Sequence, residues 1–121
     1  MLKQEVNVLY KNFITTINEF GTYLLSYSDE DIEYYVFEEF DTDSVSFLYW
    51  RNLEKLLKNK LIDKQIYKLS LKLRRDYRKL DGTQIWNVHS VRYEEKWLKL
   101  LLLSDSIKEL IEKHNEADKY S

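Results

Sequence analysis

The stretch DKQIYKLSLKLRRDYRKL, residues 63–80, decides the fold class. At 100° per residue its apolar side chains fall within an arc of about 80°, and a row of basic side chains falls within a similar arc on the opposite side. Asp63 is placed to cap the start of a helix, and Asp81-Gly82 is placed to stop it, because glycine favours a left-handed C-terminal turn. The pattern predicts an amphipathic helix whose inner face is formed by Ile66, Leu69, Leu73, Tyr77 and Leu80.

The segments before this helix repeat the same three- and four-residue spacing of apolar side chains. The spacing predicts helices at about 2–27, 29–40 and 45–60, with Gly21 a weak point in the first of them. The second helix has Ser28 as its N-cap and acidic residues in its first turn, where the helix dipole favours them. Residues 41–44 are all capping residues, which predicts a link at that point.

The segments after it are less regular. Residues 83–90 fit either the start of a helix or a short extended segment, and the helical pattern resumes by Tyr93. Ser106-Ile107-Lys108-Glu109 has the form of a capping box, which predicts a separate short last helix before a polar tail from about residue 115. The expected buried residues of the helix that follows Tyr93 are Trp97, Leu98, Leu101 and Leu102.

The composition supports a helical fold throughout. The 121 residues include no proline and only two glycines, whereas sheet-rich domains of this size spend several such residues on turns. The chain is long enough for one core and too short for two. We therefore expect residues 1–121 to form a single all-α domain, an antiparallel helical bundle of about five or six helices. Its predicted core is Val6, Phe13, Ile17, Leu48, Leu56, Leu69, Leu73, Tyr77, Trp97 and Leu101.

Several kinds of chemistry lack the residues that they need. There is no cysteine, no glycine-rich phosphate loop, and no histidine with a partner at metal-ligand spacing, since His89 and His114 stand alone. The Asp41–Asp43 segment is too short of ligands and of a loop glycine to hold a metal ion. We expect no catalytic residue, no cofactor and no metal. The longest apolar run is Leu100–Leu103, so we also expect no membrane span and a cytoplasmic location.

Charge is segregated along the chain. Residues 12–50 contain nine acidic residues and no Lys or Arg, whereas residues 51–80 contain eleven Lys or Arg against three acids, a net charge of +8. One interpretation is that the two blocks face each other in the fold, where each pair contributes about 0–1 kcal/mol.

The other interpretation is that the acidic block is a surface for a basic protein partner. Aromatic residues alternate with the acids, and one helix face cannot bury all of them, so we expect Tyr34 and Phe37 to remain outside. Exposed aromatics supply contact area, and carboxylates around them speed association with a basic partner. The predicted partner-binding residues are Asp29, Glu30, Glu33, Tyr34, Phe37, Glu38, Asp41 and Asp43.

The basic block supports a competing hypothesis. A row of cations along one helix face follows nucleic-acid phosphates, although the slight net negative charge of the whole chain disfavours this class. The alternative nucleic-acid-binding residues are Lys64, Lys68, Lys72, Arg75 and Lys79. A third hypothesis is a non-catalytic structural or phage accessory protein that oligomerises through exposed aromatic residues.

The chain resembles the small helical immunity proteins that bacteria encode beside polymorphic toxins, contact-dependent toxins and bacteriocins. The resemblance consists of its size, its helical character, the acidic aromatic segment DIEYYVFEEF at 31–40, and a composition rich in Lys, Asn, Ile and Tyr. It rests on no defining motif, so no residue role transfers by position. It implies one cognate toxin as the partner, a one-to-one complex, and blockage of the toxin's active site or of a neighbouring surface.

Overall fold

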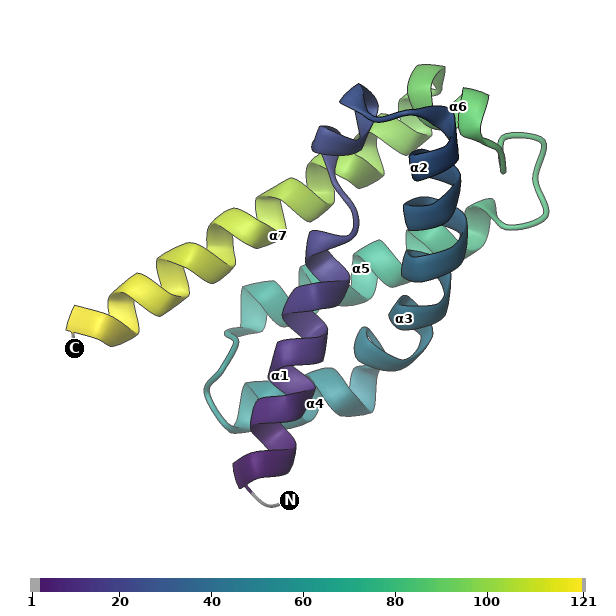
Figure 1. Ribbon diagram of the computed structural model, residues 1–121. Coiled ribbons are helices and arrows are strands. Elements are labelled where there is room, and N and C mark those ends of the chain that lie inside the picture. Colours follow the sequence, from purple (N-terminus) through teal and green to yellow (C-terminus); the bar gives the residue numbers. More distant parts are fainter. Residues whose placement is uncertain (1–2, 121) are drawn as a thin grey trace.

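The computed structural model describes the backbone of residues 3–120 and the side chains of residues 3–117, and within this range it is all helical. The predicted fold class, an all-α helical bundle, is confirmed (Figure 1). In chain order the elements are α1 (Lys3–Asn18), the 3-10 turn η1 (Thr22–Ser26), α2 (Asp29–Tyr34), the π-helical turn η2 (Tyr35–Glu39), α3 (Phe40–Phe47), α4 (Trp50–Lys58), α5 (Lys64–Leu80), α6 (Val88–Tyr93) and α7 (Glu95–Tyr120).

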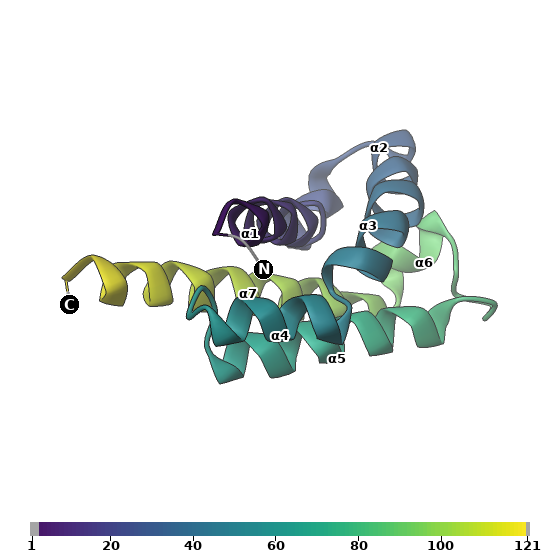
Figure 2. The same cartoon turned by 90° about the horizontal axis from the view of Figure 1, so that it is seen from below.

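The helices form two layers around one core. Helices α5 and α7 lie antiparallel on one side, and α1 lies across from them beside the continuous α2–η2–α3 rod (Figures 1 and 2). Aromatic rings fill the centre: Phe20 stacks on Phe40 with ring centroids 4.4 Å apart, Tyr77 stands edge-on to both, and Trp97 stands edge-on to Tyr77. Of the predicted core residues only Leu69 is half-buried, and the others are buried.

Helix α5 matches its predicted bounds because both of its ends carry strong local signals. The Asp63 carboxylate accepts a hydrogen bond from the Ile66 backbone N–H at 2.8 Å, as expected of an N-cap. At the other end Gly82 has φ of +81°, in the left-handed region that favours glycine.

The first helix is shorter than predicted, since it ends at Asn18 rather than near residue 27. The reason is a close approach by α7. A Cβ on Gly21 would lie 2.5 Å from Lys108 Nζ and 2.6 Å from Asp105 Oδ1, so no larger residue fits there without displacing α7 side chains. The carbonyl of Phe20, freed by the end of the helix, accepts hydrogen bonds from Ser104 Oγ at 2.6 Å and from Lys108 Nζ at 2.8 Å.

The predicted link at 41–44 is wrong, because those residues are helical. α2, η2 and α3 form one rod from Asp29 to Phe47, and the chain breaks only at Leu48. Polar side chains stay in this helix because tertiary partners hold them: Arg78 bonds both Asp41 and Ser44. The wide turn of η2 has a tertiary partner as well, since the Tyr77 hydroxyl donates to the Val36 carbonyl at 2.5 Å.

The predicted break before a short last helix is also wrong, and α7 runs unbroken to Tyr120, through the expected polar tail. Ser106, the expected N-cap, lies inside α7. The side chains of Ser104 and Asp105 just before it bond across to the segment around Phe20 and Thr22. Two residues expected to be buried, Leu98 and Leu102, are 42% and 50% exposed. Among the described residues, no helix has the combination of length and apolar character that a membrane crossing requires.

Candidate functional site

The central part of the predicted acidic surface is exposed. Glu30, Tyr34 and Glu38 follow one another at four-residue intervals along the α2–η2 rod, and Glu33 lies beside them. Tyr34 is 47% exposed, and no ion pair among the described residues involves the three glutamates. We call these four residues the acidic face. They confirm the expected exposure of Tyr34 among carboxylates.

Glu39 lies just behind the acidic face and acts on Tyr34. Its carboxylate, through a hydrogen bond and its charge, raises the pKa of the Tyr34 hydroxyl above the usual value. The spacing of five residues matches the wide π-helical turn of η2, which brings residues i and i+5 together. Sequence reasoning missed Glu39 because ordinary helical spacing separates it from Tyr34.

Phe37 is not part of the exposed surface, and its predicted exposure is wrong. Its ring packs edge-on against Trp86 at 5.0 Å and Trp97 at 5.6 Å. The prediction assumed that the rod is covered on one side only, whereas the 83–87 loop before α6 brings Trp86 over a second side. That loop had no clear pattern in the sequence, so nothing indicated that it covers the rod.

Two predicted contact residues, Asp29 and Asp41, are tied to arginines of the same chain. Asp29 pairs with Arg92 of α6 at 2.8 Å, and Arg92 also donates to the carbonyls of Leu25 and Tyr27. Asp41 pairs with Arg78 of α5 at 2.8 Å. These pairs anchor the two ends of the acidic rod, so the carboxylates are less free for a partner than those of the acidic face.

Asp43 belongs to a cluster of three half-buried carboxylates that the sequence did not reveal. One oxygen each of Glu19, Glu39 and Asp43 lie within 4.8 Å of one another. Burial, a hydrogen bond to Asp43, and the charges of Asp43 and Glu39 raise the pKa of Glu19 to about 8. A proton therefore sits on Glu19 at neutral pH and relieves the repulsion in the cluster.

This cluster is the one group among the described residues whose spacing suits a metal ion. With one oxygen each, the three carboxylates supply three of the six to eight oxygen ligands that Ca²⁺ takes, and Glu19 would have to lose its proton to bind. The two histidines lie elsewhere: His89 is exposed beside Tyr93, and His114 Nε2 lies 3.0 Å from the Lys60 carbonyl oxygen. The cluster links α1 to the rod and supplies the chemistry of a shared proton.

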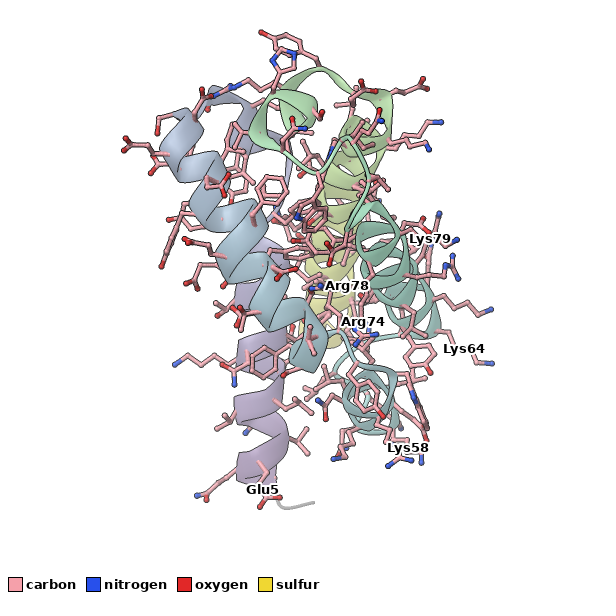
Figure 3. The ribbon with its side chains drawn as sticks, turned by 90° about the vertical axis from the view of Figure 1, so that its right-hand side faces the viewer. Glu5, Lys58, Lys64, Arg74, Arg78 and Lys79 are labelled. Carbon is pink, nitrogen blue, oxygen red and sulfur yellow. The ribbon has the colours of Figure 1, made fainter. Side chains whose placement is uncertain are left out.

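The predicted basic stripe is exposed along α5. Its five residues all lie on the surface, and Lys72 and Arg75 both pair with Asp76, at 2.5 Å and 3.4 Å. These ion pairs leave Lys64, Lys68 and Lys79 as the stripe residues with no ion pair among the described residues. Figure 3 shows Lys64 and Lys79 pointing away from the rod.

Among the described residues, the cations of the basic block that bond the acidic block are Arg74 and Arg78. Arg74 donates to the carbonyls of Ser44 and Val45, at 3.1 Å and 3.3 Å, where α3 ends. Arg78 donates to the Asp41 carbonyl and pairs with its carboxylate, and both arginines point toward the rod in Figure 3. Cations at a helix C-terminus also interact favourably with the helix dipole. The interpretation that the blocks face each other thus holds for these arginines and not for the lysines.

Comparison of the chain with protein-family models, with curated proteins and with solved structures gives no match. The two charged surfaces are therefore the features of the molecule that indicate a function.

Proposed function

We propose that this protein is an immunity-type inhibitor that binds a basic toxin domain through the acidic face. The observation that carries the proposal is the arrangement of Glu30, Glu33 and Glu38 around the half-exposed Tyr34, with no ion pair among the described residues to neutralise the carboxylates. A tyrosine gives a large contact area with few rotatable bonds, and surrounding carboxylates attract a positive partner.

The rigidity of the rod supports the same proposal. Arg92 holds it at Asp29 and Arg78 holds it at Asp41, so the acidic face lies between two points that are fixed before a partner arrives. A preorganised surface loses less side-chain and backbone freedom on binding, which leaves more of the contact energy as affinity. A nuclease toxin is the partner class that fits best, because its substrate groove is positively charged. The complex is proposed to be one-to-one, with the toxin's active site or a neighbouring surface blocked.

Binding of nucleic acid along the basic stripe is the alternative function. The observation in its favour is the exposure of all five cations on one side of α5. This support for nucleic-acid binding is weakened because Asp76 lies within the stripe and pairs with Lys72 and Arg75. Retention of DNA or RNA, lost steeply as salt rises, is the expected signature of this alternative.

The test is an affinity capture from lysate of the source cells with three forms of the protein. The first is wild type, the second carries Glu30→Lys, Glu33→Lys and Glu38→Lys, and the third carries the same change at three exposed glutamates of α7. These control positions are Glu109, Glu112 and Glu116. Both variants change net charge by the same amount, so a difference between them reports position rather than charge.

We expect wild type and the α7 variant to retain one basic protein and the acidic-face variant to lose it. Tyr34→Ala is expected to weaken the complex by about 2 kcal/mol, roughly thirtyfold, as for an interface hot spot. The captured protein is then assayed for DNA and RNA cleavage, which one equivalent of wild type should stop. If the acidic-face variant retains the same protein and inhibits it equally well, the acidic face is not the interface.

A further inference from the structure

An apolar groove with a basic rim lies between α5 and α7 and takes no part in the proposed function. It has a volume of about 500 Å³. Ser104 marks the side of α7 that faces α1, because its hydroxyl donates to the Ile17 carbonyl at 3.2 Å. Ser106 lines the groove, and two residues further along a helix correspond to a rotation of about 200°. The groove therefore opens on the outer side of the α5–α7 pair.

Leucines and lysines make up most of the groove wall. The apolar part consists of Leu80 from α5 and Leu100, Leu102 and Leu103 from α7. Leu102 is 50% exposed, an unusual position for a leucine on a helix that also contributes Leu100, Leu101 and Ile107 to the core. The lysines that line the groove are Lys72 and Lys79 from α5 and Lys96 and Lys99 from α7.

The charge of the groove is strongly one-sided. Asp76 is the one acidic residue among those that line it, and this aspartate already pairs with Lys72. Lys99 pairs with Glu95 at 3.4 Å, in a contact exposed enough to contribute little. Lys79 and Lys96 have no ion pair among the described residues. An occupant must therefore bring negative charge as well as apolar surface.

We propose that this groove binds an acidic amphipathic helix of a partner protein. Between Lys72 and Lys79 the groove runs for about 10 Å along α5, close to two turns of a helix laid beside it. Lysines stand on both helices and at both ends of this length. The matching ligand carries an apolar stripe at i, i+3, i+4 and i+7 with carboxylates on both sides of it, as in the helix-in-groove mode of recognition.

The distribution of charge also separates this ligand from an anionic amphiphile. A fatty acid or a single phospholipid carries its charge at one end of an apolar chain, which would match lysines gathered at one end of the groove. Here three lysines stand near the end where α5 stops and α7 begins, but Lys72 stands at the opposite end, and the groove is open to solvent. The acidic face lies on the rod, outside the groove, so the two surfaces can be tested independently.

The probe is a fluorescein-labelled synthetic peptide of about 18 residues, long enough to be partly helical in water, with leucines on one face and glutamates on the others. Its comparator has the same composition with the leucines scattered around the helix. Fluorescence polarisation then measures the affinity of each peptide for wild type and for charge-reversed variants. We expect wild type to bind the first peptide about tenfold more tightly than the second.

Two double variants show where the peptide binds. Lys79→Glu with Lys96→Glu reverses the unpaired groove lysines and should weaken binding by about tenfold. Lys64→Glu with Lys68→Glu makes the same change of charge on α5 outside the groove, and should alter the affinity less than about twofold. Leu102→Asn removes apolar groove surface without a change of charge and should weaken binding several-fold. Circular dichroism of each variant is the control for helical content, which should match that of wild type.

Four outcomes would overturn the proposal. Equal binding of the two peptides, or an equal loss of affinity in both double variants, would show that the peptide is held by general electrostatic attraction and not by the groove. Displacement of the peptide by vesicles of phosphatidylglycerol would indicate a membrane surface as the ligand. Self-association in sedimentation that is lost in the Lys79 and Lys96 variant would indicate a second copy of this chain. The Glu30, Glu33 and Glu38 variant should bind the peptide as wild type does, so the failure of one proposal leaves the other standing.

Discussion

The acidic rod α2–η2–α3 and the basic helix α5 both carry dense charge, but they employ it in different ways. In α5 the inward contacts to α3 come from two arginines, Arg74 and Arg78. The third arginine, Arg75, and the stripe lysines Lys64, Lys68 and Lys79 remain exposed. In the rod, the position of an acidic residue determines whether it is paired within the chain. The aspartates at 29 and 41 are paired, whereas Glu30, Glu33 and Glu38 between them are exposed and have no ion pair among the described residues.

The physical reason for the first difference is the shape of the cations. The planar guanidinium carries donors in a fork that can reach a carboxylate and a carbonyl together, and Arg78 does both at Asp41. A lysine ammonium is a strongly hydrated point charge and stays in water. A run of charge in a sequence therefore does not define an interface. The arginines of such a run are candidates for contacts within the fold. The charged residues without such contacts form the surface that is available to a partner.

Two neighbouring residues of α5 test whether an inward arginine contributes more to stability than an exposed lysine. This pair should give the largest change in the free energy of unfolding. Arg78→Ala should lower the free energy of unfolding by about 2 kcal/mol, because it removes the partner of the Asp41 carboxylate, the Asp41 carbonyl and the Ser44 hydroxyl. Lys79→Ala removes an equal charge from the exposed stripe and should change stability by less than about 0.5 kcal/mol. Urea unfolding followed by circular dichroism measures both. Equal losses in the two variants would contradict the distinction between arginine and lysine.

A smaller change in stability is expected from Tyr77, the α5 residue that hydrogen-bonds the wide turn η2 of the rod. Tyr77→Phe removes the hydroxyl that donates to the Val36 carbonyl at 2.5 Å, and both groups are buried. We expect a loss of about 1–1.5 kcal/mol, since the carbonyl would be left without this partner. The control is Tyr67→Phe, at a half-buried tyrosine of the same helix, which should be nearly neutral. A loss at Tyr77 no larger than at Tyr67 would show that the turn does not depend on this hydrogen bond.

The parts of the fold that the sequence predicts are those with a strong local cause. Helix α5 has a periodic face, an N-cap at Asp63 and a left-handed glycine at 82, and its bounds were correct. The early end of α1 has a distant cause instead. It depends on Lys108 and Asp105 lying against Gly21, a contact between residues more than eighty positions apart that no local pattern encodes.

The same distinction applies to the candidate site. The exposure of Tyr34 follows from helical spacing within one segment, and so does the exposure of the basic stripe. The burial of Phe37 depends on Trp86, which a loop brings over the rod, and the pairing of Asp41 depends on Arg78 from another helix. The prediction was wrong for Phe37 and incomplete for Asp41. The local sequence around an aromatic or a capping residue does not indicate its tertiary partner.

The carboxylate cluster gives the smallest expected effect and the most direct link between charge and pH. Burial, with Asp43 and Glu39 nearby, raises the pKa of Glu19 from 4.5 to about 8. Between these two values the folded protein holds a proton that the unfolded chain releases, so stability should fall as pH rises from about 4.5 and level off above about 8. Because solvent reaches part of the cluster, we expect the free energy of unfolding to fall by about 1 kcal/mol in total. This is less than the full value implied by the raised pKa of Glu19.

Glu19→Gln should remove most of this slope, because glutamine carries no charge at any pH and can still donate a hydrogen bond to Asp43. Thermal unfolding at a series of pH values from 5 to 9 measures it, with about 4 °C as the expected gain of the variant at the alkaline end. Glu33→Gln, on the acidic face and outside the cluster, should keep the wild-type slope. Parallel pH profiles for wild type and Glu19→Gln would show that the proton is held elsewhere, and the rod would then carry its internal charges without this neutralisation. Convergence of the two profiles at acid pH, with separation only at alkaline pH, would instead identify Glu19 as the group that titrates and separate this buried cluster from the open glutamates of the acidic face.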